Sequence, residues 1–270
     1  MSLIKKILLF DPLIQLGCAV WNLCMDLVSA LFGITPTNIG GGKIWAFMVG
    51  NIYPTFLAIG ASLLCIFFLI GFCKEAADIR LVLNAESSLM MFVRLVVSNA
   101  AVTTVLAWAP VFFVMATDLT SFGGITDAHF EAFEIEENAG LMTVWTLSFL
   151  FCMVAIIGGM MIVFCVYKRA FNLILLLPMA PIALSTLAGG QGISRSADAW
   201  FRTFLGSVFD IVIMYIALLL GSQIIQSGGL VTGTGVDVGF LKMLDMSFCI
   251  ILLASAVKGS ETLIRRAFAF

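Results

Sequence analysis

Residues 44–73 have the sequence IWAFMVGNIYPTFLAIGASLLCIFFLIGFC, in which no side chain is charged. A transmembrane helix needs roughly 20 mostly apolar residues, because the hydrocarbon core is about 30 Å thick and a helix rises about 1.5 Å per residue. Further charge-free runs occupy residues 95–117, 138–167, 170–194 and 211–236. The sequence therefore predicts an all-α integral membrane protein.

The composition of the whole chain agrees with this class. Of the 270 residues, 61% are hydrophobic and only 11% are charged, whereas soluble domains contain about 25% charged residues. The single histidine, His129, excludes a multi-histidine metal site, and the net charge of −2 gives no global attraction for nucleic acid. The seven cysteines form no C-x-x-C pair, and we expect them to be packed as small apolar residues.

We predict five transmembrane helices in a polytopic domain, residues 44–270. Trp45 and Trp145 lie near the ends of two of them, where an indole anchors at the membrane interface. The predicted spans cover about residues 47–72, 95–117, 143–167, 204–226 and 240–257.

Residues 1–43 are predicted to form a separate unit, an amphipathic helix followed by a glycine-rich joint at residues 35–42. Polar residues recur at helical spacing among apolar ones and form one polar stripe. The stripe allows three placements: in the outer interface, against a neighbouring subunit, or across the membrane with the stripe facing a water-filled path. Its members are Asp11, Gln15, Asn22, Asp26 and Ser29.

Residues 170–192 (AFNLILLLPMAPIALSTLAGGQG) are apolar but contain Pro178 and Pro181. An internal proline removes a backbone donor and disfavours a straight helix. A proline-kinked span is one possibility. The alternative, which we favour, is a re-entrant segment that enters the membrane and returns to the same side.

The distribution of basic residues decides between these topologies, because cytoplasmic loops are enriched in lysine and arginine. If residues 170–192 cross, six basic residues lie inside and eight outside; if they re-enter, ten lie inside and four outside. The re-entrant topology puts the N-terminus outside and the C-terminus in the cytoplasm, with residues 190–203 and 258–270 inside. The ten inside are Lys74, Arg80, Arg94, Lys168, Arg169, Arg195, Arg202, Lys258, Arg265 and Arg266.

The same topology places residues 118–142 outside. This stretch lacks lysine and arginine and contains six acidic residues beside His129. We expect a solvated acidic loop, with a docking surface for an extracytoplasmic partner as the alternative. One histidine among carboxylates does not predict a metal site.

No catalytic motif occurs in the chain, so we expect no enzyme and no bound cofactor. Residues 40–44 (GGGKI) lack the spacing and the Ser or Thr of a phosphate-binding loop. Intramembrane charges are the remaining candidates for function, since each is costly in lipid. Asp210 lies inside the fourth predicted span and is expected to pair with Arg94 or Arg202.

Residues 168–210 (KRAFNLILLLPMAPIALSTLAGGQGISRSADAWFRTFLGSVFD) resemble a known pattern. The stretch is similar to the TrbL-type polytopic membrane subunit of conjugation and type IV secretion systems, the family of the sixth VirB component. The matching features are Arg169, Ala180-Pro181-Ile182, a glycine turn at residues 189–192, and Trp200. The segment FCKEAADIR at residues 72–80 also resembles versions from Gram-positive mobile elements.

The resemblance implies a non-catalytic channel or scaffold subunit in the bacterial cytoplasmic membrane. Such a subunit forms a homo-oligomer and, with partner ATPases and other secretion subunits, helps to pass single-stranded DNA with attached protein. Two other classes stay open: a secondary transporter or channel for a small solute, with Asp210 and the broken segment forming its site, or a structural anchor of an assembly.

Arg195, Trp200 and Arg202 follow the broken segment and are candidate contacts for the substrate. Arginines attract phosphate, and an indole can stack on any base. The alternative is that the arginines follow the positive-inside rule and Trp200 anchors at the interface.

Overall fold

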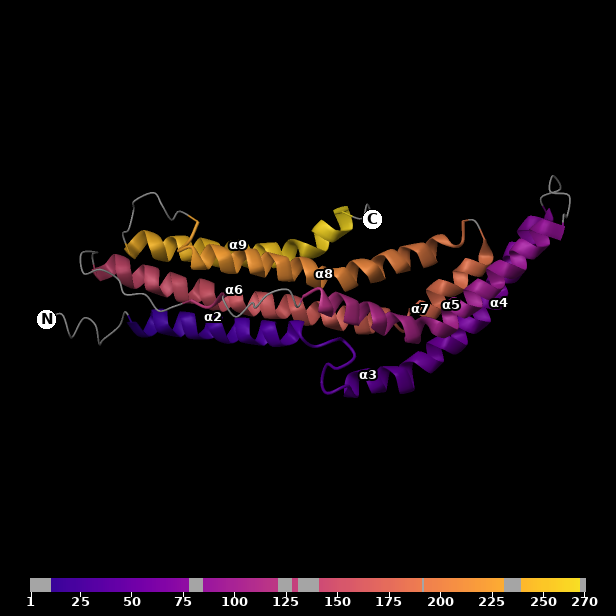
Figure 1. The fold of residues 1–270 in the computed structure, drawn as a ribbon, viewed down its shortest axis with the longest axis horizontal. Helices are drawn as coiled ribbons and strands as arrows, with labels where there is room; N and C mark the ends of the chain where they lie inside the picture. Colours follow the sequence, from indigo (N-terminus) through magenta and orange to yellow (C-terminus); the bar gives the residue numbers. More distant parts are fainter. Residues whose placement is uncertain are drawn as a thin grey trace. The chain divides into compact units, whose positions relative to one another are not determined.

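The computed structural model describes residues 11–77, 85–120, 128–130, 141–190, 192–230 and 239–267. Within these ranges the chain forms helices joined by short irregular segments, and no strand occurs (Figure 1). The predicted all-α class is confirmed. The helices are α2 (Asp11–Phe32), α3 (Lys43–Phe47), the π-helix η2 (Met48–Ile52), α4 (Tyr53–Ala77), α5 (Ala85–Asp118), α6 (Leu141–Leu176), α7 (Ala180–Ser185), the 3-10 helix η4 (Thr186–Gly189), α8 (Arg195–Gln226) and α9 (Gly239–Ala267).

Six of the described helical segments are long and apolar enough to cross a membrane. Five of them match the predicted spans, three containing the span in full and two beginning two residues later than predicted. The additional one, Pro12–Phe32, belongs to the N-terminal amphipathic helix. Crossing the membrane is one of the three placements that the sequence allows for this helix. The six are Pro12–Phe32, Lys43–Lys74, Leu89–Asp118, Trp145–Leu176, Arg195–Gln226 and Lys242–Ile264.

Helices α6 and α8 extend beyond the spans predicted within them. α6 continues through Lys168 and Arg169 to Leu176, and α8 begins at Arg195 instead of near residue 204. The predicted spans stop short of these charged residues because an unpaired charge is costly in hydrocarbon. Arg169 is nevertheless only 7% exposed, and it has an acidic neighbour, described below, that makes its burial tolerable.

The described residues fall into two compact units. Unit 1 contains those within Met1–Gly33, Thr117–Arg169 and Asp210–Ile264; unit 2 contains those within Ile34–Ala116, Ala170–Phe209 and Arg265–Phe270. This division differs from the boundary predicted at residue 43. Helix α2 packs within unit 1 because its inner face is apolar, whereas the glycine-rich joint belongs to unit 2.

Glycines bring the helices of unit 1 close together. A Cβ on Gly17 would lie 3.2 Å from the Cα of Cys152, and a Cβ on Gly159 would lie 3.1 Å from the Cβ of Cys24. Helices α2 and α6 therefore run side by side in the same direction (Figure 1). Small residues at such contacts let helix backbones approach, as is common in membrane bundles. On the other side of the bundle, Gly158 of α6 meets Ile250 of α9.

Unit 2 is built on an antiparallel pair, α4 and α5. The Tyr53 hydroxyl donates to the Val102 carbonyl at 3.3 Å, and the rings of Phe68 and Phe92 lie 6.3 Å apart. Pro54 has no N–H for the carbonyl four residues earlier, which accounts for the wider π-helical turn of η2 just before it.

The glycine-rich joint enters this unit as a series of left-handed turns. Gly40, Gly41 and Gly42 have φ angles of 63°, 66° and 77°. Only glycine adopts this region freely, so the three consecutive glycines allow the chain to turn into α3.

Candidate functional site

Helix α6 ends where two prolines interrupt the chain. Pro178 has no N–H to donate to the carbonyl four residues earlier, and the helix stops at Leu176. The Ala180 N–H donates to the Leu177 carbonyl at 3.0 Å and closes the turn. Pro181 lies in the first turn of α7, where no N–H is required. The two prolines thus separate a long helix from a short one.

We use the name broken segment for helices α7 and η4 together with the turn that precedes them. This broken segment packs along α4. A Cβ on Gly60 would lie 2.7 Å from the Cβ of Pro181, and a Cβ on Gly71 would lie 3.2 Å from the carbonyl carbon of Gly189. The broken segment and α4 therefore run in the same direction over about 16 Å, at 1.5 Å per residue. Irregular backbone at membrane depth needs cover from protein or water, and α4 supplies protein cover here.

Two hydrogen bonds join the start of α8 to the end of α6 and to the broken segment. The indole Nε1 of Trp200 donates to the Leu176 carbonyl at 3.1 Å. The backbone N–H of Ala197 donates to the Thr186 hydroxyl oxygen at 3.2 Å. The last four carbonyls of a helix lack partners within it, so Trp200 satisfies a carbonyl that the proline break leaves free.

Trp200 is buried, with 7% of its surface exposed. Its ring stacks on Phe204, with centroids 5.3 Å apart and an interplanar angle of 13°, and Trp108 approaches at 6.3 Å. An indole packed in this way has no open face for a nucleic-acid base. The stacking role considered for Trp200 is therefore replaced by a packing and hydrogen-bonding role in unit 2.

The three arginines considered from the sequence have different surroundings. Arg195 is exposed at the start of α8. Arg202 is also exposed and pairs with Asp198, one turn earlier, at 3.3 Å. Arg94 is half-buried on α5, and its Nη1 lies 2.7 Å from the position of a Cβ on Gly190. Its guanidinium therefore reaches the turn that follows η4.

Asp210 lies inside unit 1 with a partner that the sequence did not indicate. It is 5% exposed on α8 and interacts electrostatically with Arg169 of α6. The Ser260 hydroxyl of α9, itself fully buried, lies within hydrogen-bonding reach of the carboxylate. Asp210 Oδ1 has no hydrogen-bond partner among the described residues. Arg169 therefore takes the place that we expected for Arg94 or Arg202.

A second ion pair lies beside this buried one. Lys168 Nζ is 3.7 Å from Glu261 Oε2, and the two side chains are 54% and 49% exposed. Exposed pairs of this kind contribute about 0–1 kcal/mol. The two adjacent basic residues of α6 thus both face acidic residues, one on α8 and one on α9.

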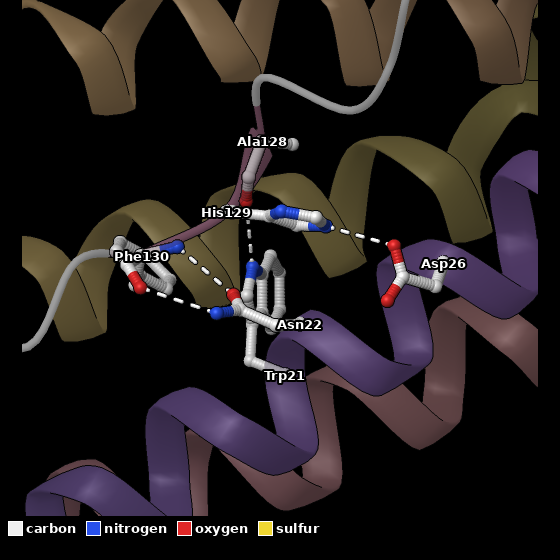
Figure 2. Close-up of polar contacts among 6 residues, drawn as sticks. All are labelled: Trp21, Asn22, Asp26, Ala128, His129 and Phe130. Atoms are coloured by element: carbon white, nitrogen blue, oxygen red, sulfur yellow. Dashed lines mark hydrogen bonds and ion pairs between the residues drawn. The ribbon is translucent and has the colours of Figure 1, made fainter.

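A polar contact, shown in Figure 2, joins α2 to residues 128–130 within unit 1. The Trp21 indole donates to the Ala128 carbonyl at 2.9 Å. The Asn22 amide donates to the Phe130 carbonyl at 3.2 Å and accepts from the Phe130 N–H at 2.9 Å. The side chain of Asn22 therefore satisfies both backbone groups of one loop residue. We call this set of contacts the α2 latch.

An ion pair and aromatic packing complete the α2 latch. His129 Nε2 lies 3.0 Å from Asp26 Oδ1 (Figure 2). Trp21 is fully buried, and its ring lies 5.5 Å from that of Phe130. Two members of the predicted polar stripe, Asn22 and Asp26, thus have partners within the same chain. The rest of the acidic loop at residues 118–142, apart from residues 118–120, 128–130 and 141–142, lies outside the described residues.

These observations define the class of the protein. Its described helices are those of a multi-pass α-helical membrane protein, with a proline-broken segment in one unit and a buried acid–base pair in the other. Among the described residues, no group of three or more His, Cys, Asp or Glu side chains could hold a metal ion. Comparison with family models, with curated proteins and with solved structures finds no match to this chain.

Proposed function

We propose that this chain is a non-catalytic channel or scaffold subunit of a conjugative type IV secretion machine. It lies in the bacterial cytoplasmic membrane as a homo-oligomer, with its N-terminus outside and its C-terminus inside. Together with other secretion subunits and their ATPases, it helps to pass single-stranded DNA with attached protein.

One observation carries this proposal. The residues of the resemblance belong to a continuous stretch, Lys168–Asp210, whose proline break, glycine turn and tryptophan have linked roles. Pro181 packs on α4, Gly190 lies beside Arg94, and Trp200 caps the end of α6. Because these residues contact one another or the same helices, the motif is better explained by an architecture shared with that family than by a chance succession of apolar segments.

The orientation is supported by the charge distribution together with the packing of unit 2. The turn after η4 lies beside Gly71 of α4 and Arg94 of α5. The last turn of α4, which carries Lys74, and the start of α8, which carries Arg195, therefore share one end of unit 2. Both carry basic residues, which favours a cytoplasmic position for that end.

The first experiment is deletion of the gene in donor cells, with measurement of transfer to recipients. We expect transfer to be lost and to be restored by the parental gene. Adjacent genes for a relaxase, a coupling ATPase and an assembly ATPase would accompany this result. Transfer that is unchanged by the deletion would refute the proposal.

A second experiment tests whether exposed arginines contact the substrate. The double variant Arg195→Gln/Arg202→Gln removes two exposed cations without touching the hydrogen bond of Trp200. We expect unchanged membrane level and oligomer size but weaker crosslinking of transferring DNA to this subunit. Arg195→Lys/Arg202→Lys, which keeps both charges, is the control. Parental crosslinking by the Gln variant would show that these arginines serve only to orient the chain.

The homo-oligomer has its own test, because a monomer of this size cannot enclose a path as wide as DNA. Native mass spectrometry in mild detergent should detect oligomers. Monomer alone, across several detergents and concentrations, would contradict this part of the proposal.

A second candidate function, a transporter or channel for a small solute, is favoured by the buried Asp210, whose Oδ1 has no hydrogen-bond partner among the described residues. Ion-gradient-dependent uptake by the purified protein in liposomes would support this function. Loss of that uptake in Asp210→Asn would assign it to this carboxylate. A purely structural anchor would instead show assembly defects, and no point variant would block transfer alone.

A further inference from the structure

The α2 latch lies at a depth where lipid alone cannot surround it. Helix α2 runs parallel to α6, with Gly17 beside Cys152 and Cys24 beside Gly159. Asp26, two residues beyond Cys24, is therefore level with the part of α6 just after Gly159. At 1.5 Å per residue, that level is about 24 Å from Trp145 and about 10 Å from Lys168. Trp145 is the first residue of the candidate span within α6, and Lys168 is the first charged residue of that helix.

The polar groups of the latch remain open to their surroundings. The side chains of His129 and Asp26 are 37% and 58% exposed, and residues 128–130 are not part of a longer helix. Charged side chains and irregular backbone at membrane depth occur where protein buries them or where they line a water-filled cavity. The described residues leave the pair exposed, so water or a second copy of the chain surrounds it.

The exposed surface of α2 has an apolar stripe suited to lipid and a polar stripe suited to water. One stripe consists of Leu16, Leu23 and Leu27, which are 50%, 60% and 45% exposed. The neighbouring stripe contains four of the five polar residues predicted from the sequence, together with the small residue Ala19. We call this second set, Gln15, Ala19, Asn22, Asp26 and Ser29, the polar stripe of α2.

We propose that the polar stripe of α2 lines a water-filled path at membrane depth, with the Asp26–His129 pair on its wall. The path opens on the side where α6 begins. A single apolar stripe of leucines beside it faces lipid. This inference depends on α6 crossing the membrane, and it does not depend on the transfer of DNA or protein.

Cysteine accessibility tests the proposal directly. Starting from a variant that lacks the seven native cysteines, we would introduce Ala19→Cys on the polar stripe and Leu23→Cys on the leucine stripe. Ile157→Cys, 64% exposed on α6, reports lipid at a similar depth. A charged, membrane-impermeant methanethiosulfonate reagent is then added outside cells that express this protein alone. Gln15→Cys provides a second position on the polar stripe if Ala19→Cys is poorly expressed.

We expect the stripe cysteine to react at least about tenfold faster than those at Leu23 and Ile157, because the reactive thiolate forms only in water. Equally slow reaction at all three positions would show that lipid or a second copy covers the stripe, and would overturn the proposal. Equally fast reaction at all three would show that this level lies outside the membrane, and would overturn it as well. If DNA transfer does not depend on the gene, the proposed function is refuted, but the result of the cysteine-accessibility experiment still stands.

Discussion

Asp210 and Arg169 place opposite charges in the interior of an apolar bundle, and each makes the burial of the other tolerable. Removal of one partner from such a pair leaves an uncompensated buried charge, which costs about 3–5 kcal/mol. Removal of both leaves no such charge. The two residues should therefore show strong coupling in a double-mutant cycle.

Asp210→Asn should lower the free energy of unfolding by about 3–5 kcal/mol, because it leaves the Arg169 charge buried without its partner. Arg169→Gln should have a similar effect, and the double variant should lose much less than the sum. Chemical unfolding of the purified protein in detergent measures all three.

The neighbouring pair of Lys168 and Glu261 supplies the matched control. It joins α6 to α9, and both side chains are about half exposed. Glu261→Gln should change stability by at most about 1 kcal/mol. If Asp210→Asn proves no more destabilising than Glu261→Gln, the buried pair does not have the structural role assigned to it.

At the scale of the elements, the broken segment depends on a side chain from another helix. The Trp200 indole satisfies the Leu176 carbonyl at the end of α6. Trp200→Phe keeps an aromatic ring beside Phe204 but removes the indole donor from that part-buried carbonyl. We expect a loss of about 1–3 kcal/mol in stability, measured by thermal or chemical unfolding.

Trp145→Phe is the control for this substitution, because Trp145 is 43% exposed and lies near the start of α6. Its effect should stay within about 0.5 kcal/mol, as for other surface changes. Equal effects of the two substitutions would show that the hydrogen bond of Trp200 contributes nothing measurable.

Gly60 tests the packing of the broken segment on α4. A Cβ at this position would lie 2.7–2.8 Å from the Cβ and backbone of Pro181. Gly60→Ala should therefore destabilise the protein by about 1–3 kcal/mol through overpacking. Gly259→Ala, at a helical position with no atom within 4 Å, should be neutral or stabilise by up to about 1 kcal/mol. Similar unfolding midpoints for the two variants would contradict the close approach.

The helical elements could be predicted from the sequence because a charge-free run long enough to span a membrane is a local signal. The proline break between α6 and α7 is local for the same reason. The exact helix ends could not be predicted, since α6 continues past Arg169 only because Asp210, distant in sequence, lies beside it. The positions of charge-free runs in the sequence carry no information about such distant partners.

The candidate sites divide in the same way. The polar stripe of α2 was visible as a periodic pattern, but its partners at residues 128–130 are about a hundred positions away. Trp200 was visible as part of a motif, whereas its burial depends on Trp108 and Phe204. The periodicity of one sequence predicts which residues share a helix face, but it does not predict which other residues pack on that face.

For the whole molecule, the central claim is that the chain crosses the membrane several times and that the turn after the broken segment lies on the cytoplasmic side, as the re-entrant topology predicts. Within unit 2, Gly189 lies beside Gly71 and Gly190 beside Arg94. The turn after the broken segment thus lies at the end of α4 that leads into residues 78–84. The charge distribution predicts the cytoplasm for this end and the outside for the acidic stretch at residues 118–142. Residues 128–130 of that stretch reach membrane depth along the proposed water-filled path.

The most direct measurement labels single cysteines from one side of the membrane. In a variant without other cysteines, Cys73 and Ser194→Cys report on the end of unit 2, and Thr126→Cys, outside the described residues, reports on the acidic loop. An impermeant thiol reagent added to intact cells should label Thr126→Cys alone, and Cys73 and Ser194→Cys should react only after permeabilisation. Labelling of Ser194→Cys together with Thr126→Cys in intact cells, while Cys73 stays protected, would contradict the re-entrant topology.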